Sequence, residues 1–454
     1  MLNARKRFVL SVVLTAVVVV IGGGASALAA PVAKVRCVPV VTVNSGCTAA
    51  TTYATIQAAV NAASSYDVIY VGPGTYHESV TISEADHARD YLSLLGAQAG
   101  NDARVGRSNP LAESIVDATG KSDSAIIVEA LAVVVDGFTL QGATQGGASG
   151  VALKGTCGES LITPANGGIV VNNILTNNAT GISLNAEGYG TEEECPTGAF
   201  VIGILVEHNY IKTNNAGQLA VYPGYGIYSG GVEHAAISQN AFYGHKACGV
   251  CLENAEDVTI TNNTSLKDAS FAQFYATSNV FFIGNQGTNF GGNGTLGDSS
   301  WYGDGAVSVA LGNQYLVIAE NVLAGGITPI ANGISFTNVL DNEGDINTDV
   351  YVKNNTISGF PQNGIVVEEF EDLAGTLKSS VILGNVVTYN GLDGIFIDGA
   401  TANGSNQVLD NQAMGNHRFD CHDDTSGAGT DSTANFWFHN IAIYSQPRGL
   451  CKSN

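Results

Sequence analysis

The stretch from residue 237 to residue 285 reads ISQNAFYGHKACGVCLENAEDVTITNNTSLKDASFAQFYATSNVFFIGN. It contains one short phrase three times: a hydrophobic residue, two variable residues and an asparagine. The copies are Ile237–Asn240, Ile260–Asn263 and Phe282–Asn285, and their asparagines are 23 and 22 residues apart. A period of this length is typical of a repeat array, in which each repeat is one structural unit that stacks on the next.

The phrase occurs nine times between residues 170 and 413. The other six copies are Val170–Asn173, Val206–Asn209, Ile318–Asn321, Val352–Asn355, Ile382–Asn385 and Val408–Asn411. The spacing never falls below 22 and reaches 36, which indicates one turn of chain plus variable loops. Asparagine tolerates the left-handed backbone that a sharp corner needs. We therefore expect these asparagines to stack at one corner, about 4.8 Å apart, in a structural role.

A second phrase, glycine followed by apolar, variable and apolar residues, alternates with the first. It occurs at Gly181–Leu184, Gly333–Phe336, Gly364–Val367 and Gly394–Ile397, and in related form at Gly226–Tyr228 and Gly249–Leu252. Such alternation predicts strands with one face inward and one face outward. By contrast, Tyr53–Ala63 has helical periodicity and precedes a predicted strand at Val68–Val71, so we expect a helix that caps the first coil.

Together these features resemble the right-handed parallel β-helix of the pectate-lyase-like superfamily. The resemblance rests on the asparagine phrases, the Gly-Ile-x-Leu strands and the opening TIQAAVNAA…DVIYVGPGTY, and it covers residues 53–420. It implies an all-β solenoid of about ten or eleven coils. Residues 30–52 would form an N-terminal segment and residues 421–454 a C-terminal tail closed by a disulfide. It also implies that a substrate binds along the sheet built from the glycine-led strands.

The N-terminal residues predict export. Arg5, Lys6 and Arg7 precede an apolar run, Phe8–Ile21, and a small-residue cleavage site at Ala27–Ala29, so residues 1–29 are predicted to be a signal peptide. The run is shorter than the roughly 18 residues of a membrane span. Removing the three cations changes the formal net charge from −22 to −25. Such a charge excludes nucleic acid and anionic lipid as partners and repels a bare polyuronate unless a cation intervenes. We expect a secreted protein without a membrane anchor.

Eight cysteines in an exported chain predict disulfides. We expect Cys421 to pair with Cys451 and Cys37 with Cys47, because each pair brackets one end of the chain. Cys248 and Cys251 form a Cys-x-x-Cys sequence, which can signal redox or metal chemistry. A lone pair in a predicted strand is weak support for either.

The candidate site follows from the resemblance. The outward residues of the glycine-led strands are Ser183, Tyr228, Cys251, Ser335, Val366 and Phe396. The residues that follow the last two strands, Glu368 and Asp398, are predicted neighbours on consecutive coils. Two carboxylates so close raise a pKa or recruit a cation. They are therefore the predicted catalytic residues and, with Glu369, the predicted ligands of a calcium ion. The alternative is a solvated acidic rim.

On the other side of these strands Asn332, Asn363 and Asp393 are expected to stack before the glycines. Asp393 would lie roughly 16 Å from Asp398, too far for a glycosidase pair. A working pair must then come from adjacent coils.

Aromatic side chains add a second clue. Tyr225 and Tyr228 lie in the sequence YPGYGIY, and Trp301 and Tyr302 lie in a glycine-rich insertion. With Phe396 they are the predicted sugar-binding residues, because flat rings beside acids suit a sugar. Packing between coils is the alternative.

Residues near the last coil leave two interpretations open. His417, Asp420, His422, Asp423 and Asp424 could hold a metal, or they could belong to a capping segment. Arg418, the only arginine between residues 107 and 447, is expected far from the acidic pair, which disfavours a lyase with an arginine base. The motif sets of polygalacturonases and alginate epimerases of this fold are also absent.

Two functions remain. The first is a carbohydrate-active protein that acts on a polysaccharide at the glycine-led sheet, as a hydrolase or a lyase. The second is a non-enzymatic extracellular protein that uses the same groove for binding or adhesion. Fold does not decide between them.

Overall fold

The computed structural model describes residues 33–452, with gaps at 40–45, 84–86, 156–164, 187–200, 217–223, 292–304, 330, 338–345, 369–375 and 401–402. The predicted signal peptide lies outside the described residues, as do Trp301, Tyr302, Glu369, Cys157 and Cys195. No helix in the described part is long and apolar enough to cross a membrane.

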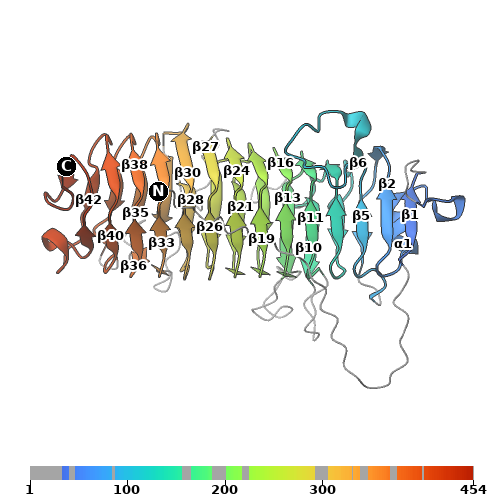
Figure 1. The fold of residues 1–454 in the computed structure, drawn as a ribbon, viewed down its shortest axis with the longest axis horizontal. Coiled ribbons are helices and arrows are strands. Elements are labelled where there is room, and N and C mark those ends of the chain that lie inside the picture. The colour runs from blue at the N-terminus through green and yellow to red at the C-terminus, as the bar shows by residue number, and fades with distance from the viewer. Residues whose placement is uncertain are drawn as a thin grey trace, which may run out of the picture. The chain divides into compact units, whose positions relative to one another are not determined.

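The chain forms a right-handed parallel β-helix, as the sequence predicts. Three long sheets run along it, and every strand pairs in parallel with its counterpart on the neighbouring coil. Strands β1 to β42 follow one another in chain order along a single axis (Figure 1). The sheets hold 14, 13 and 12 strands, so there are more coils than the ten or eleven expected. The additional coils include the first ones, which lack the asparagine phrase.

The 14-stranded sheet carries the hydrophobic residue of each asparagine phrase at its centre, pointing inward. Its strands are β1 (Val35–Val38), β2 (Val68–Val71), β5 (Ser93–Leu95), β8 (Val134–Asp136), β11 (Ile169–Val171), β15 (Leu205–Glu207), β19 (Ala236–Ser238), β23 (Thr259–Thr261), β26 (Phe281–Ile283), β29 (Val317–Ala319), β33 (Tyr351–Lys353), β37 (Val381–Leu383), β40 (Gln407–Leu409) and β43 (Phe436–Phe438).

The 12-stranded sheet follows the asparagine corner, and its central side chains also enter the core. Its strands are β3 (Gly74–Tyr76), β6 (Ser114–Asp117), β9 (Phe138–Gln141), β12 (Ile174–Thr176), β16 (Tyr210–Lys212), β20 (Ala241–Tyr243), β24 (Thr264–Leu266), β27 (Gln286–Phe290), β30 (Val322–Gly326), β34 (Thr356–Ser358), β38 (Val386–Thr388) and β41 (Gln412–Met414).

The 13-stranded sheet contains the glycine-led strands and is the sheet expected to carry the site. Its strands are β4 (Val80–Ile82), β7 (Ile126–Val128), β10 (Ser149–Gly155), β13 (Thr180–Ala186), β17 (Tyr225–Ser229), β21 (Cys248–Glu253), β25 (Ser270–Tyr275), β28 (Gly305–Ala310), β31 (Asn332–Thr337), β35 (Ile365–Glu368), β39 (Ile395–Ile397), β42 (Cys421–Asp423) and β44 (Ser445–Gln446). Two small sheets join loops: β14 (Val201–Ile202), β18 (Val232–Glu233) and β22 (Ala255–Glu256), and β32 (Asn347–Thr348) and β36 (Leu377–Lys378).

The asparagines stack as predicted. Asn240 donates its backbone N–H to Oδ1 of Asn263 at 2.8 Å, and Asn263 repeats this bond to Asn285 at 2.9 Å. The same ladder runs from Asn173 to Asn411 and continues to Asn440. Every ladder asparagine is buried, so the amide groups replace water as partners for the corner backbone.

The reason given for asparagine is wrong. The ladder asparagines do not have positive φ. The residue before each of them does, and its identity varies: Asn172, His208, Gln239, Asn262, Gly284, Glu320, Asn354, Gly384, Asp410 and His439. Asparagine is selected for its two-sided amide, which accepts from one coil and donates to another. The sharp backbone turn falls one residue earlier.

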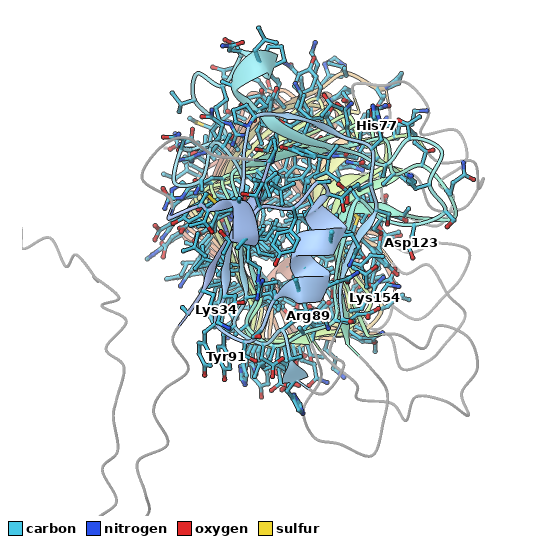
Figure 2. All side chains as sticks on the ribbon, turned by 90° about the vertical axis from the view of Figure 1, so that its right-hand side faces the viewer. Lys34, His77, Arg89, Tyr91, Asp123 and Lys154 are labelled. Carbon is cyan, nitrogen blue, oxygen red and sulfur yellow. A yellow bond between two sulfur atoms is a disulfide. The ribbon has the colours of Figure 1, made fainter. Side chains whose placement is uncertain are left out.

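A helix closes the N-terminal end of the coil stack. Helix α1 (Ile56–Ala62) lies across the first coil, where Figure 2 looks along the axis, and it buries Ile56, Ala59 and Val60. Its free N–H groups at Ile56 and Gln57 donate to the carboxylate of Glu78. Short 3₁₀ turns occur at Ala49–Thr51, Pro110–Ala112 and Thr430–Ser432.

The predicted disulfides Cys37–Cys47 and Cys421–Cys451 are both present. Cys248 and Cys251 also pair with each other, within β21. The terminal segments belong to the sheets, because β1 pairs with β2 and β42 pairs with β44.

Candidate functional site

The outward row of the 13-stranded sheet has the predicted register. Ser183, Tyr228, Cys251, Gln273, Ser308, Ser335, Val366, Phe396 and His422 occupy equivalent positions on successive strands. The central members of this row, from Cys251 to Val366, are at most 2% exposed. The row therefore offers side-chain surface mainly at its two ends, around Tyr228 and around Phe396, and not as one continuous groove.

The tyrosine end is largely internal packing. Tyr225 is 4% exposed and, with the paired Cys248 and Cys251, forms a small apolar cluster against which Tyr228 packs. The two tyrosine rings lie 5.0 Å apart, and the Tyr228 hydroxyl donates to Glu253 at 3.0 Å. Tyr228 and Phe396 are six strands apart, roughly 29 Å at about 4.8 Å per strand. They belong to the same row but not to one compact site.

The predicted acidic neighbours lie in register. Glu368 ends β35 and pairs with Thr337 on the preceding coil. Asp398 directly follows β39, and its N–H donates to the carbonyl of Val367 at 2.8 Å, which places it one coil beyond Glu368. Asp424 takes the same position on the next coil, because its N–H donates to Ile397. The residues Glu368, Asp398 and Asp424 therefore follow one another at single-coil steps along one edge of the sheet.

A buried ion cluster adjoins this edge. Asp393 has no exposed surface, and its carboxylate accepts hydrogen bonds from Nε of Arg418 and from the backbone N–H of Phe419, each at 2.9 Å. Nδ1 of His422 lies 2.8 Å from the same carboxylate, and Nε2 of His422 lies 3.0 Å from Asp424. One imidazole thus joins a buried acid to an acid whose side chain is 50% exposed.

Aromatic rings hold this cluster in place. The ring of Phe396 stacks on His422 with centroids 4.6 Å apart, and the guanidinium of Arg418 lies over Phe396 at 5.4 Å. Phe419 contacts the other side, 5.0 Å from the His422 ring. The half-buried Phe396, predicted to bind sugar, is therefore the central ring of the cluster.

Hydrogen bonds keep Asp393 ionised. Burial by itself raises the pKa of Asp393, but hydrogen bonds from Arg418, His422 and Phe419 outweigh it and hold that pKa below its usual value. The Nδ1 side of the His422 ring therefore faces a carboxylate, and Nε2 faces the exposed carboxyl group of Asp424. This pair can give or take a proton at the protein surface.

The acidic and histidine residues of the last coil divide between two roles. Asp420 is buried and accepts from Asn416, Ile443 and Tyr444, which fastens the C-terminal tail. Asp423 is also buried and accepts from Thr425 and from Nε1 of Trp437. The capping interpretation fits these two acids, whereas His422 and Asp424 face outward. Among the described residues no group of three or more His, Cys, Asp or Glu side chains is arranged to hold a metal ion.

Arg418 belongs to the cluster around Phe396. Its guanidinium lies over that ring and pairs with Asp393, at the opposite end of the strand from Asp398. Sequence reasoning placed Asp393 and Phe396 on the correct strand. It did not recognise residues 420–424 as one further copy of the glycine-led strand, so it missed the cluster.

Comparisons with known proteins agree on the fold. No family model matches this chain, and no curated protein does. Among solved structures, the catalytic unit of a thermostable alpha-1,3-glucanase from Streptomyces thermodiastaticus matches at 14% identity with a TM-score of 0.52, covering 86% of this chain and 66% of that one. This chain thus spans just under two thirds of the glucanase unit.

Two further solved structures are also similar. An alginate lyase from Paenibacillus matches at 12% identity and a TM-score of 0.41, over 90% of this chain and 99% of that one. A surface adhesin of Streptococcus pneumoniae matches at 16% identity and a TM-score of 0.40, over 79% and 85%. At these identities the likeness shows the parallel β-helix fold alone.

Proposed function

We propose that this protein is a glycoside hydrolase that acts at the C-terminal end of the 13-stranded sheet. The observation that carries the proposal is the position of His422 between buried Asp393 and half-exposed Asp424, on the outward row and stacked on Phe396. A proton-transfer pair beside an aromatic ring at the surface suits a sugar whose glycosidic oxygen must be protonated.

Each residue has a defined role in this proposal. The His422–Asp424 pair donates a proton to the leaving oxygen. Asp398, one coil away, supplies the second carboxylate. A coil spacing of about 4.8 Å is close to the roughly 5–5.5 Å that separates the two carboxyl groups of retaining glycosidases. Asp393 and Arg418 are positioning residues, because they touch His422 and Phe396 and not the substrate.

Other features support an extracellular glycan as the substrate class. Three disulfides within the described residues fit an oxidising compartment, where the predicted signal peptide would deliver the chain. The fold shared with a glucanase is a fold-level analogy in the same direction. Glu368, one coil further from the cluster, remains the proposed site for calcium together with Asp398.

The test is a screen of neutral and acidic polysaccharides, with and without calcium, that records both new reducing ends and unsaturated ends. On any substrate found, Asp424→Asn and Asp398→Asn should each lower kcat by about 10²-fold or more. Asp410→Asn is the matched control, because Asp410 is an exposed aspartate of the asparagine corner that lies near His439. It should leave kcat unchanged.

The other outcomes discriminate between functions. Unsaturated ends would replace the hydrolase by a lyase. Loss of glycan binding in both variants, without turnover in the parent protein, would favour the non-enzymatic binding function. Unchanged turnover in both variants would leave the acids as surface solvation and refute the proposed centre.

A further inference from the structure

A cavity of about 700 Å³ lies at the C-terminal end of the coil stack, next to the His422 cluster. Its lining includes Phe419, Tyr444, Ser445, Gln446, Arg448 and Lys452. This volume lies within the roughly 300–1,000 Å³ of ligand-binding pockets. The cavity is large enough to admit a sugar unit, and it is formed mainly by the tail that the Cys421–Cys451 disulfide holds in place.

Phe419 joins this cavity to the candidate site. The centroid of its ring lies 5.0 Å from the His422 ring and 6.0 Å from the Arg418 guanidinium, and Phe419 is also one of the residues that line the cavity. The cavity therefore adjoins the candidate site. The exposed ring of Tyr444 provides a second aromatic surface there.

The charge around the cavity is opposite to that of the chain. Two cations, Arg448 and Lys452, line it, and its described lining contains no carboxylate. Within the described residues neither cationic side chain makes a hydrogen bond or an ion pair. Asp420, which lies behind the tail, is 1% exposed, and its carboxylate is occupied by backbone and amide donors. Asp431 lies against Gly449 and is not a lining residue.

Two cations line this cavity, although the chain as a whole carries a net charge of −22. Charges farther away than about 8 Å are largely screened at physiological ionic strength, so a bound group responds mainly to the nearby charges: the two lining cations and the carboxylate of Asp431 against Gly449. The repulsion of acidic glycans expected from composition is therefore reduced at this cavity.

We propose that this cavity binds an anionic group carried by a sugar, the carboxylate of a uronic acid or a sulfate ester, next to the sugar unit that reaches His422. The proposal rests on the proposed function, and it assigns the substrate class of that site as an acidic glycan. Arg448 and Lys452 bind the anion, and Phe419 and Tyr444 contact the apolar faces of the sugar rings.

The experiment measures the affinity of the full chain by calorimetry for three hexasaccharides of equal length: a galacturonan, a heparin-type sulfated chain and a neutral maltohexaose. The test variant is Arg448→Gln/Lys452→Gln, which removes two exposed cations while keeping side-chain length. The matched control is Lys121→Gln/Lys267→Gln, which removes the same charge far from the cavity. Circular dichroism checks that each variant is folded.

We expect the parent protein to bind one acidic hexasaccharide at least tenfold more tightly than the neutral one. The test variant should lose most of that preference, about tenfold, whereas its affinity for maltohexaose and the behaviour of the control stay unchanged. The preference should also weaken as salt is added. The galacturonan and heparin arms identify which anion is recognised.

Several results would overturn the inference: no preference for either acidic chain, a preference that survives in the test variant, or an equal loss in the control. Failure of the proposed function looks different. If Asp424→Asn changes no turnover while the acidic preference depends on Arg448 and Lys452, the cavity binds acidic glycans and the catalytic proposal falls. If turnover depends on Asp424 but the affinity for acidic hexasaccharides does not depend on Arg448 and Lys452, the catalytic proposal holds and the cavity proposal is refuted.

Discussion

Replacing one ladder asparagine, Asn263→Ala, tests how the fold is held together. In the native protein the Asn263 amide makes four hydrogen bonds: Nδ2 donates to Ile237 and to Asn285, and Oδ1 accepts the backbone N–H and Nδ2 of Asn240. All of these groups are buried. At about 1 kcal/mol of net stability per bond, the variant should lose about 4 kcal/mol. The orphaned N–H of Asn240 can add to this, because a buried unpaired group costs about 1–3 kcal/mol.

The matched control is its neighbour, Asn262→Gly. Asn262 is exposed, and its φ of 55° lies in the left-handed region of the backbone. Glycine adopts this conformation without steric cost, so the free energy of unfolding should change by less than about 1 kcal/mol. Two adjacent asparagines in one corner should therefore differ by several kcal/mol because only one of them bridges coils.

The assay is urea unfolding followed by circular dichroism, with hydrogen exchange read separately in β19, β23 and β26. Exchange is needed because a solenoid can open locally, and a single unfolding free energy then underestimates the damage. We expect faster exchange in those three strands and little change in β1 or β43. If Asn263→Ala costs no more than Asn262→Gly, the ladder is not what fixes the corner.

Three further predictions concern other parts of the molecule. Removing the Cys421–Cys451 disulfide by a Cys421→Ser/Cys451→Ser double variant should cost about 3–4 kcal/mol for a separation of 30 residues, measured by urea unfolding; a loss below about 1 kcal/mol would mean that the tail is held without it. Folding lowers the pKa of Asp393, so the free energy that its carboxylate contributes to folding is complete above the unfolded pKa of about 3.9 and is lost as pH falls through the lowered pKa. Asp393→Asn should therefore reduce the free energy of unfolding most above about pH 4. A loss of stability that grows in acid would contradict this. Arg107→Gln should cost about 3–5 kcal/mol, because it leaves buried Glu113 with a hydrogen bond from Thr139 but without its cation. Limited proteolysis should then cut within residues 97–113, and unchanged resistance would show that this ion pair does not hold the segment.

The fold could be predicted because its signal repeats. The spacing of Asn240, Asn263 and Asn285 predicted the coil length. The alternation in Gly333–Phe336 predicted strands with one face inward and one face outward. The first coils were harder to count, because their corners lack the asparagine phrase. After Gly137, for example, Phe138 stands where later coils carry the asparagine, although its N–H still donates to the amide of Asn173 on the next coil.

The cluster was missed because its strand lacks the leading glycine. A Cβ on Gly333 would lie 2.3 Å from the carbonyl of Gly364, and one on Gly394 would lie 2.5 Å from the carbonyl of Asp420, so these two strands need glycine there, whereas β25 and β28 carry Phe271 and Ala306 at the equivalent position. On the last coil Asp420 occupies this position, and only the short strand β44 follows. The glycine that marks the other strands in the sequence is therefore missing from this copy. Glu368 and Asp398 were placed in register, but their partners on the final coil carried no repeat signal.

The left-handed corner residues have a practical consequence. They form a straight series of partly or fully exposed positions, one per coil, from Asn172 to His439, and the native chain already places amide, imidazole, carboxylate and glycine residues there. Side-chain identity at these positions is therefore largely free, whereas their separation is fixed in steps of about 4.8 Å. Cysteines introduced at two chosen corners would hold a pair of spin labels or fluorophores at a distance set by the number of intervening coils. The protein could then serve as a rigid molecular ruler.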